Sequence, residues 1–297
     1  MFINEIETSS PLALALGTFD GVHLGHQAVL SLARENGHAL RPAALFFTPH
    51  PRTVLTGAAP GLILTEAERE KVLRAEGMQE IIRIDFTAVH ALPPEKFFRR
   101  LTDALPIGML CCGYNFRFGS RGAGDTDTLA SLCRAAGIRF AAAGKVELDK
   151  APVSSSRIRD CIERGDMPTA ERLIGRPLLY SLKVEDGDRR GRTIGFPTIN
   201  QALPAELARP RFGVYVSEVL LDGRWRRAVT NIGIRPTYQV EHPLFETFII
   251  GYSGNLYGEE VCLRLRKFIR PEKRFSSLEA LKAAIEGDLA AALSYKE

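Results

Sequence analysis

The sequence predicts an α/β domain followed by a smaller antiparallel β domain that ends in a helix. Three observations lead to this prediction. The chain has 297 residues, about twice the usual size of one domain. Up to about residue 175, short apolar runs alternate with segments of helical period, as in a parallel sheet flanked by helices. Beyond Tyr180, β-branched and aromatic runs punctuated by glycine are typical of a small barrel or sandwich.

In the first half, short apolar runs are expected to form parallel strands. The first two begin roughly thirty residues apart, which is the length of a βαβ unit. Before the third, Thr65 and Glu68 form a capping box that opens a helix, and Gly77 can close that helix. The expected strands are Leu12–Leu16, Ala43–Phe47, Glu80–Ile84, Met109–Cys112 and Arg139–Ala142.

The second half is expected to contain antiparallel strands and a closing helix. Ser276 and Glu279 make a second capping box before a Leu/Ala-rich stretch that runs to Leu293. We predict the domain boundary near Arg176 and Pro177, which gives one domain over residues 1–176 and another over 177–297. The clearest strand candidates are Gly213–Val219, Phe245–Ile250 and Val261–Phe268.

Composition argues against several classes of protein. The net charge of +4 divides into +1 up to residue 180 and +3 after it, a balance too even to predict a patch for nucleic acid or a membrane surface. The longest apolar runs are about five residues, whereas a membrane helix needs about twenty. The N-terminus is acidic and lacks the basic start and apolar centre of a signal peptide. The five cysteines form no C-x-x-C pair, so we expect reduced thiols in a cytoplasmic protein.

A glycine-rich turn directly after the first expected strand is the most informative segment. It reads Gly-Thr-Phe-Asp-Gly-Val-His-Leu-Gly-His over residues 17–26. Glycines permit close backbone approach, and the N–H groups at a helix start form an anion site. His23 and His26 lie on one helical face and can donate hydrogen bonds to phosphate oxygens. The turn therefore predicts a phosphate site, and its spacing differs from the Rossmann dinucleotide fingerprint.

Two other interpretations of the turn stay open. The glycines can simply serve a strand-to-helix connection, with both histidines solvated. A zinc site would need a third ligand, and the remaining histidines form no matching cluster. Those histidines are His38, His50, His90 and His242.

Two later segments can converge with this turn. Gly-Tyr-Asn-Phe-Arg-Phe-Gly at 113–119 follows the fourth expected strand, and Val-Ser-Ser-Ser-Arg-Ile-Arg at 153–159 precedes a helix. The carboxyl ends of parallel strands gather at one edge of the sheet, which brings such loops together. Serines at a helix start with two arginines suit a triphosphate. Taken alone, these serines are more typical of a helix cap than of a ligand site.

The second half carries a different candidate phosphate loop, residues 186–200. Its glycines and basic side chains can wrap a polyphosphate, and Thr198 and Asn200 supply the oxygen atoms that magnesium prefers. Without further context, an exposed basic loop before a turn is the simpler interpretation.

Together these motifs resemble the bacterial bifunctional riboflavin kinase/FAD synthetase family. The first half shares the turn at 17–26, Phe-Phe-Thr-Pro-His-Pro at 46–51 and the two later segments. The second half carries Gly-Phe-Pro-Thr-Ile-Asn at 195–200, where the family has G-x-P-T-A-N. Further matches lie at 213–215, 231–237 and 256–258, so the resemblance covers nearly the whole chain in the family's order. The chain departs from the family with Thr48 in place of Asp, Gly251-Tyr252 in place of Asp-Phe, and Asp186 in place of His.

The resemblance implies two successive ATP-dependent reactions. A Rossmann-like nucleotidyltransferase would use ATP and magnesium to adenylate FMN, and a six-stranded antiparallel barrel would phosphorylate riboflavin. His23 and His26 would contact the ATP phosphates, Thr198 and Asn200 would lie at the magnesium–ATP site, and Glu246 would be the catalytic base. The residues expected to bind ATP or substrate are Gly17, Phe19, Asp20, Gly25, Asn115, Arg117, Ser155, Ser156, Arg157, Arg159, Gly191, Arg192, Gly195, Phe196 and Pro197.

Glu246 also makes chemical sense by its position, since it interrupts an otherwise apolar strand. An alcohol that attacks a phosphate needs a group within hydrogen-bond reach to accept its proton. The alternative is that strand alternation simply turns this carboxylate to solvent.

Two alternatives to the full function remain at this point. In one, only the adenylyltransferase half turns over and the barrel holds flavin. In the other, the chain is a flavin-binding regulator without activity. Incubation with riboflavin, ATP and magnesium separates these cases by their products. The expected partners are small molecules (riboflavin, FMN and ATP) and neither nucleic acid nor membrane, while assembly of several copies is left open.

Overall fold

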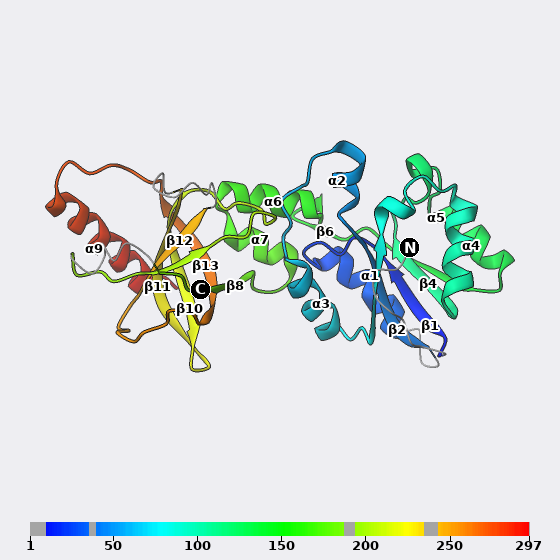
Figure 1. The fold of residues 1–297 in the computed structure, drawn as a ribbon, viewed down its shortest axis with the longest axis horizontal. Coiled ribbons are helices and arrows are strands. Elements are labelled where there is room, and N and C mark those ends of the chain that lie inside the picture. Colours follow the sequence, from blue (N-terminus) through cyan, green and yellow to red (C-terminus); the bar gives the residue numbers. More distant parts are fainter. Residues whose placement is uncertain (1–9, 36–39, 187–193, 235–242, 297) are drawn as a thin grey trace. The chain divides into compact units, whose positions relative to one another are not determined.

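The structure is a computed structural model that describes residues 10–35, 40–186, 194–234 and 243–296. The chain divides into two compact units, Met1–Ser155 and Ser156–Glu297, and each is described by itself (Figure 1). This division places two helices, α6 (Ser155–Arg164) and α7 (Met167–Ile174), almost entirely in the second unit. The boundary between residues 176 and 177 stays a prediction. In the described part of the chain, no helix is long and apolar enough to cross a membrane.

The first unit contains a five-stranded parallel sheet in the order β3-β2-β1-β4-β5. The strand order reverses at β1, which pairs with β2 on one side and β4 on the other. Open α/β sheets bind ligands at this switch point, beyond the carboxyl ends of the strands. The strands are β1 (Leu12–Leu16), β2 (Arg41–Thr48), β3 (Glu80–Asp85), β4 (Ile107–Gly113) and β5 (Arg139–Ala143), so the predicted parallel sheet is confirmed.

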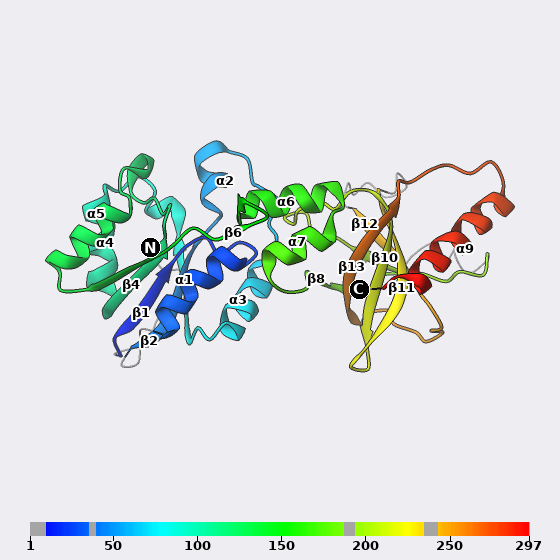
Figure 2. The ribbon, with the colours of Figure 1, turned by 180° about the vertical axis from the view of Figure 1, so that it is seen from behind.

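Helices cover both faces of this sheet. Alternate side chains of β1, such as Leu12 and Leu14, join a core that includes Phe97 of α4 and Leu129 of α5. Figure 2 shows α1 on the side of the sheet away from α4 and α5. The predicted capping box is present at the start of α3, where Thr65 and Glu68 exchange hydrogen bonds. The helices are α1 (Leu24–Glu35), α2 (Pro51–Thr56), α3 (Glu66–Ala75), α4 (Pro94–Ala104) and α5 (Thr126–Ala135), with short turns η1 (Phe86–Ala88) and η2 (Ser120–Gly122) and a hairpin of β6 (Glu147–Leu148) and β7 (Ala151–Pro152).

The second unit contains a six-stranded antiparallel sheet in the order β8-β13-β10-β11-β12-β9. A bridge between Glu185 and Asn200 joins its two edges, so the sheet closes almost completely into a barrel. This confirms the predicted barrel. Its strands are β8 (Leu179–Lys183), β9 (Ile199–Ala202), β10 (Gly213–Leu221), β11 (Arg224–Gly233), β12 (Leu244–Ile249) and β13 (Glu260–Arg270).

The closing helix α9 (Leu278–Ser294) is present, but its predicted capping box is wrong by one residue. Ser277 is the N-cap because it has the extended backbone of that position, and its side chain accepts a hydrogen bond from the Ala280 amide at 3.1 Å. The helix packs on the barrel, where Ala292 joins a cluster with Val214 of β10 and Val229 of β11.

The barrel interior holds a row of hydrogen-bonded hydroxyl groups. The Ser217 and Thr230 hydroxyl oxygens are 2.7 Å apart, and those of Thr230 and Thr247 are 2.9 Å apart. All of these side chains are fully buried. Each hydroxyl therefore has a hydrogen-bond partner at a place that water does not reach.

An ion-pair network joins α7 to the outer face of the barrel. Arg264 of β13 donates from Nε and Nη2 to the two carboxylate oxygens of Glu171, at 2.8 and 2.7 Å. Glu171 also accepts a hydrogen bond from the Leu178 amide at 3.1 Å, and Arg266 lies 3.8 Å away. The bidentate geometry and the shielding of both side chains make this one of the stronger types of ion pair.

Candidate active sites

The two predicted histidines lie together where β1 gives way to α1. Their rings stack with centroids 3.7 Å apart and an angle of 13° between the planes. The His26 amide donates a hydrogen bond to Nδ1 of His23 at 3.3 Å, so a neutral His23 ring carries its proton on Nε2. Phe19 packs edge-on against His26, with centroids 5.4 Å apart. Gly25 lies against the His23 ring, where a Cβ would come within 3.2 Å of Cε1.

The backbone of this turn adopts conformations that L-residues rarely take. Phe19 and Val22 have φ of 48° and 40°, and Gly21 lies between them with φ of 82°. A Cβ on Gly21 would also come within 2.8 Å of the Ile63 side chain. Such backbone strain persists only where the surroundings hold it, and it is common at functional sites.

Buried polar contacts hold the turn in this shape. Asp20 is fully buried, and its Oδ1 accepts a hydrogen bond from the Ile63 amide at 2.9 Å. Arg69 of α3 donates from Nη1 to the Thr18 carbonyl at 2.9 Å, with its guanidinium carbon 4.2 Å from the centre of the Phe46 ring. Burial lowers the pKa of Arg69, and the negative charge of Asp20 opposes that shift. The charge of Asp20 thus favours the charged form of the buried Arg69 guanidinium beside the turn.

The segment at 153–159 reaches the same turn through its first helical residue. The Ser155 hydroxyl donates to the Asp20 carbonyl at 2.9 Å, which brings residues far apart in sequence together, as expected for loops at one sheet edge. Ser156, Arg157 and Arg159 follow on α6, in the second unit. Their relation to the histidine pair stays a prediction.

Asn115 and Arg117 lie in the loop after β4, the strand next to β1. Both side chains are exposed. Arg117 forms an ion pair with Asp125, the N-cap of α5, at 3.5 Å. Hydrogen bonds from Thr128, the backbone one first, lower the pKa of Asp125. The structure thus places both residues beyond the carboxyl end of β4, while the contact described for Arg117 is with the N-cap of α5.

The departure at Thr48 is accompanied by a nearby carboxylate that the sequence alone did not indicate. The Thr48 hydroxyl donates to Glu66 Oε2 at 3.1 Å, and Glu66 Oε1 accepts from Arg83 at 2.9 Å. Thr48 ends β2 and Glu66 begins α3. A carboxylate therefore lies beside this strand end, although it comes from another part of the chain.

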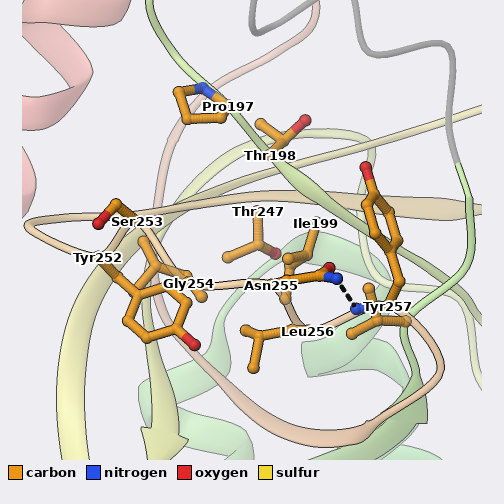
Figure 3. Close-up of a pocket in the computed structure, with 12 residues that line it drawn as sticks. Pro197, Thr198, Ile199, Thr247, Tyr252, Ser253, Gly254, Asn255, Leu256 and Tyr257 are labelled. Atoms are coloured by element: carbon orange, nitrogen blue, oxygen red, sulfur yellow. Dashed lines mark hydrogen bonds between the residues drawn. The ribbon is translucent and has the colours of Figure 1, made fainter.

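In the second unit, Thr198 lies at a pocket of about 330 Å³. Figure 3 shows Pro197 and Thr198 on one side of it and the loop from Tyr252 to Tyr257 on the other. The Asn255 side chain shapes this loop by accepting a hydrogen bond from the Tyr257 amide at 3.2 Å. The volume is in the range that holds a small ligand. This loop contains the Leu-Tyr-Gly match at 256–258, but the sequence alone did not predict that it lines a pocket.

Of the phosphate loop at 186–200, the structure describes only the two ends. Phe196 packs edge-on against Phe248 of β12, with ring centroids 5.7 Å apart, and Gly195 has φ of 92° just before it. Gly191 and Arg192 lie outside the described residues.

Asn200 and Glu246 lie side by side on neighbouring strands. They are direct partners in the antiparallel ladder of β9 and β12, so their side chains lie on the same face. Asn200 is 5% exposed, and its Oδ1 has no hydrogen-bond partner among the residues that the structure describes. A buried oxygen of this kind is costly unless a ligand completes it. With the Thr198 hydroxyl two residues earlier, it fits a hard cation such as magnesium.

Glu246 is half-buried and has a partner that the sequence did not predict. Asn231 lies opposite Glu246 on β11, and its Nδ2 is 3.4 Å from Glu246 Oε2. The same Nδ2 donates to Glu272 Oε1 at 3.1 Å. The motif at 231–237 contains Asn231, but only the strand register reveals what it faces.

Comparisons with known proteins agree with this two-part arrangement. A family model described as FAD synthetase matches residues 5–157, and one described as riboflavin kinase matches residues 174–296. A bifunctional riboflavin kinase/FMN adenylyltransferase from Pseudomonas fluorescens is 36% identical over 282 residues, which cover 93% of this chain and 90% of the relative. The protein of the same description from Bacillus subtilis is 33% identical over 299 residues, covering 97% and 94%.

A solved structure shows the same fold over almost the whole length. It is from Streptococcus pneumoniae, bears the name macrolide-efflux protein, and is 30% identical with a TM-score of 0.90, covering 98% of this chain and 97% of that one. The relatives and both family models together lead to one conclusion: the chain belongs to the family of bifunctional riboflavin kinase/FMN adenylyltransferases.

Proposed function

We propose that the barrel phosphorylates riboflavin to FMN and that the α/β unit adenylates FMN to FAD, with one ATP consumed in each step. The observation that carries the proposal is the stacked pair of His23 and His26 at the switch point of the parallel sheet. The match of both family models and of full-length relatives favours two activities over a barrel that only holds flavin. The same matches favour an enzyme over a flavin-binding regulator.

In the adenylation step, an oxygen of the FMN phosphate attacks the α-phosphorus of ATP. The bond from that phosphorus to the bridging oxygen breaks, and pyrophosphate leaves. We assign His23 and His26 to the phosphate oxygens, where N–H donors stabilise the charge that builds up during transfer. The turn residues Gly17, Phe19, Asp20 and Gly25 form the backbone cradle for the phosphates, and Asn115, Arg117, Ser155, Ser156, Arg157 and Arg159 are proposed to complete the nucleotide and FMN sites.

In the kinase step, the 5′-hydroxyl of riboflavin attacks the γ-phosphorus of ATP and ADP leaves. Glu246 accepts the hydroxyl proton as the new O–P bond forms. The pocket beside Thr198 is proposed to hold part of the ATP, with Gly191, Arg192, Gly195, Phe196 and Pro197 around the phosphates. Thr198 and Asn200 would hold magnesium, which when bound neutralises phosphate charge.

The remaining assignments extend this proposal. The relatives are bacterial enzymes, and the thiols lie mostly in the interior, which supports a cytoplasmic protein with reduced cysteines. The partners are riboflavin, FMN and ATP, and the even charge favours neither nucleic acid nor membrane. Assembly of copies of the chain is compatible with this function but is not required by it.

Chromatography of the products from riboflavin, ATP and magnesium tests both sites. We expect His26→Ala to stop FAD formation while FMN accumulates. Glu246→Gln should stop FMN formation from riboflavin but still convert added FMN to FAD. Loss of both products in either variant, with the protein still folded, would show that the two reactions do not have separate sites.

A further inference from the structure

We propose that Asn231 and Glu272 are positioning residues for Glu246 in the kinase reaction, and that Gly233 is a glycine because it leaves room for Glu272. This inference depends on the proposed role of Glu246 as the base. None of these three residues is among those that the sequence predicts to bind ATP, substrate or metal or to act as the base.

Asn231 connects two carboxylates through one amide group. Its side chain lies on the same face as Glu246, because the two are direct partners in the β11–β12 ladder. The distances from Nδ2 are 3.4 Å to Glu246 Oε2 and 3.1 Å to Glu272 Oε1. An amide nitrogen carries two hydrogens, so it can donate to both carboxylates at once. The contact to Glu272 is the shorter one, so Glu272 fixes the amide that in turn orients Glu246.

Glu272 reaches this position from a different part of the chain. It follows the end of β13 and precedes α9, whereas Asn231 and Glu246 lie on β11 and β12. The carboxylate lies where a Cβ on Gly233 would be, with Cδ of Glu272 at 2.7 Å and Oε2 at 2.8 Å from that position. Gly233 pairs with Leu244 within the ladder, and its φ lies outside the left-handed region. An alanine there is therefore compatible with the backbone and acts mainly by displacing the Glu272 carboxylate.

Orientation of Glu246 matters because proton transfer depends strongly on geometry. A carboxylate anchored at one oxygen loses rotation about its last bonds and presents the same edge to each substrate. Errors of about 1 Å in such an arrangement can cost about a hundredfold in rate. Glu272 itself is exposed, and its contribution acts through Asn231.

The test is steady-state riboflavin phosphorylation by full-length variants. We expect Glu272→Ala and Gly233→Ala each to lower kcat by about tenfold or more, with KM for riboflavin and ATP nearly unchanged. Glu272→Gln should keep most of the rate, since its side-chain oxygen can still accept the hydrogen bond from Asn231. The double variant Gly233→Ala/Glu272→Ala should be no slower than the single ones, because both changes remove the same contact.

The controls separate positioning from general damage. Conversion of added FMN to FAD should be unchanged in all variants, and Glu206→Ala, which removes another exposed carboxylate from the same unit, should keep the kinase rate. An unchanged kcat in Glu272→Ala and Gly233→Ala, or a rise in KM alone, would overturn the positioning role of Asn231 and Glu272. If Glu246→Gln is inactive in the same assay, Glu246 remains the base even then. If Glu246→Gln keeps its kinase activity, the proposed base is wrong, and the inference falls with it.

Discussion

Replacement of Glu171 by alanine should destabilise the second unit strongly. Glu171 is the α7 partner of Arg264 on the barrel, and the two side chains are only 14% and 17% exposed. The change removes both contacts with the guanidinium and the acceptor for the Leu178 amide. Removing one partner of a buried ion pair lowers the free energy of unfolding by about 3–5 kcal/mol. Because both side chains keep some exposure, we expect the lower end of this range, about 3 kcal/mol.

Urea denaturation can isolate this effect, because the chain has a single tryptophan and it lies in the barrel. The fluorescence of Trp225 on β11 therefore reports unfolding of the second unit. With a denaturant slope of about 2 kcal/mol per molar, a loss of about 3 kcal/mol lowers the urea midpoint by about 1.5 M. Glu171→Gln should shift it less, since the amide oxygen still accepts from the backbone.

Two further variants make the comparison decisive. Glu163→Ala removes an exposed carboxylate from α6 and should leave the midpoint nearly unchanged. The double variant Glu171→Ala/Arg264→Ala should be less destabilised than the sum of the single changes, because both remove one interaction. A midpoint in Glu171→Ala within about 0.3 M of the control would refute the view that this ion pair fastens α7 to the barrel.

Three other predictions follow from buried features. Gly21→Ala should lower the stability of the first unit by about 1–2 kcal/mol because of the left-handed backbone, and the clash of the new Cβ with Ile63 adds to this loss. On heating, the variant should therefore lose its activity of FAD synthesis from FMN with a shorter half-life than the wild type, and an equal half-life would contradict this. Thr247→Val removes one end of the hydroxyl row and should lower stability by about 1–2 kcal/mol in the same fluorescence titration, whereas an unchanged midpoint would mean that the row adds nothing. Burial raises the pKa of Cys111 and of Cys112 to about 12, so neither should react with a thiol reagent at pH 8 until the protein unfolds, which thiol counting with and without denaturant checks. Above about pH 9 the unfolded chain loses these protons and the folded one keeps them, so both thiols make stability fall as pH rises.

The sequence alone predicted the fold of each half well, because the strand and helix patterns of neighbouring residues match the elements that the chain forms. Short apolar runs and β-branched or aromatic runs located the strands, and Thr65 with Glu68 marked the start of a helix correctly. The same kind of signal failed at Ser276, where two adjacent serines are equally good caps and only the backbone conformation chooses Ser277. Motif order also led to the correct family, since glycine turns and paired histidines are contiguous in the chain.

What the sequence supplied by itself was the set of chemical groups proposed for each site: the imidazoles of His23 and His26, the oxygens of Thr198 and Asn200, and the Glu246 carboxylate. The tertiary structure decided which groups from distant segments meet them. The sequence predicted that the segment at 153–159 can approach the histidine turn, but the structure supplied the contact itself, from the Ser155 hydroxyl to the Asp20 carbonyl. The link from Glu272 through Asn231 to Glu246 had no local sequence signal. The physical reason is that strand register and loop closure create these contacts, and both depend on the packing of the whole unit rather than on neighbouring residues.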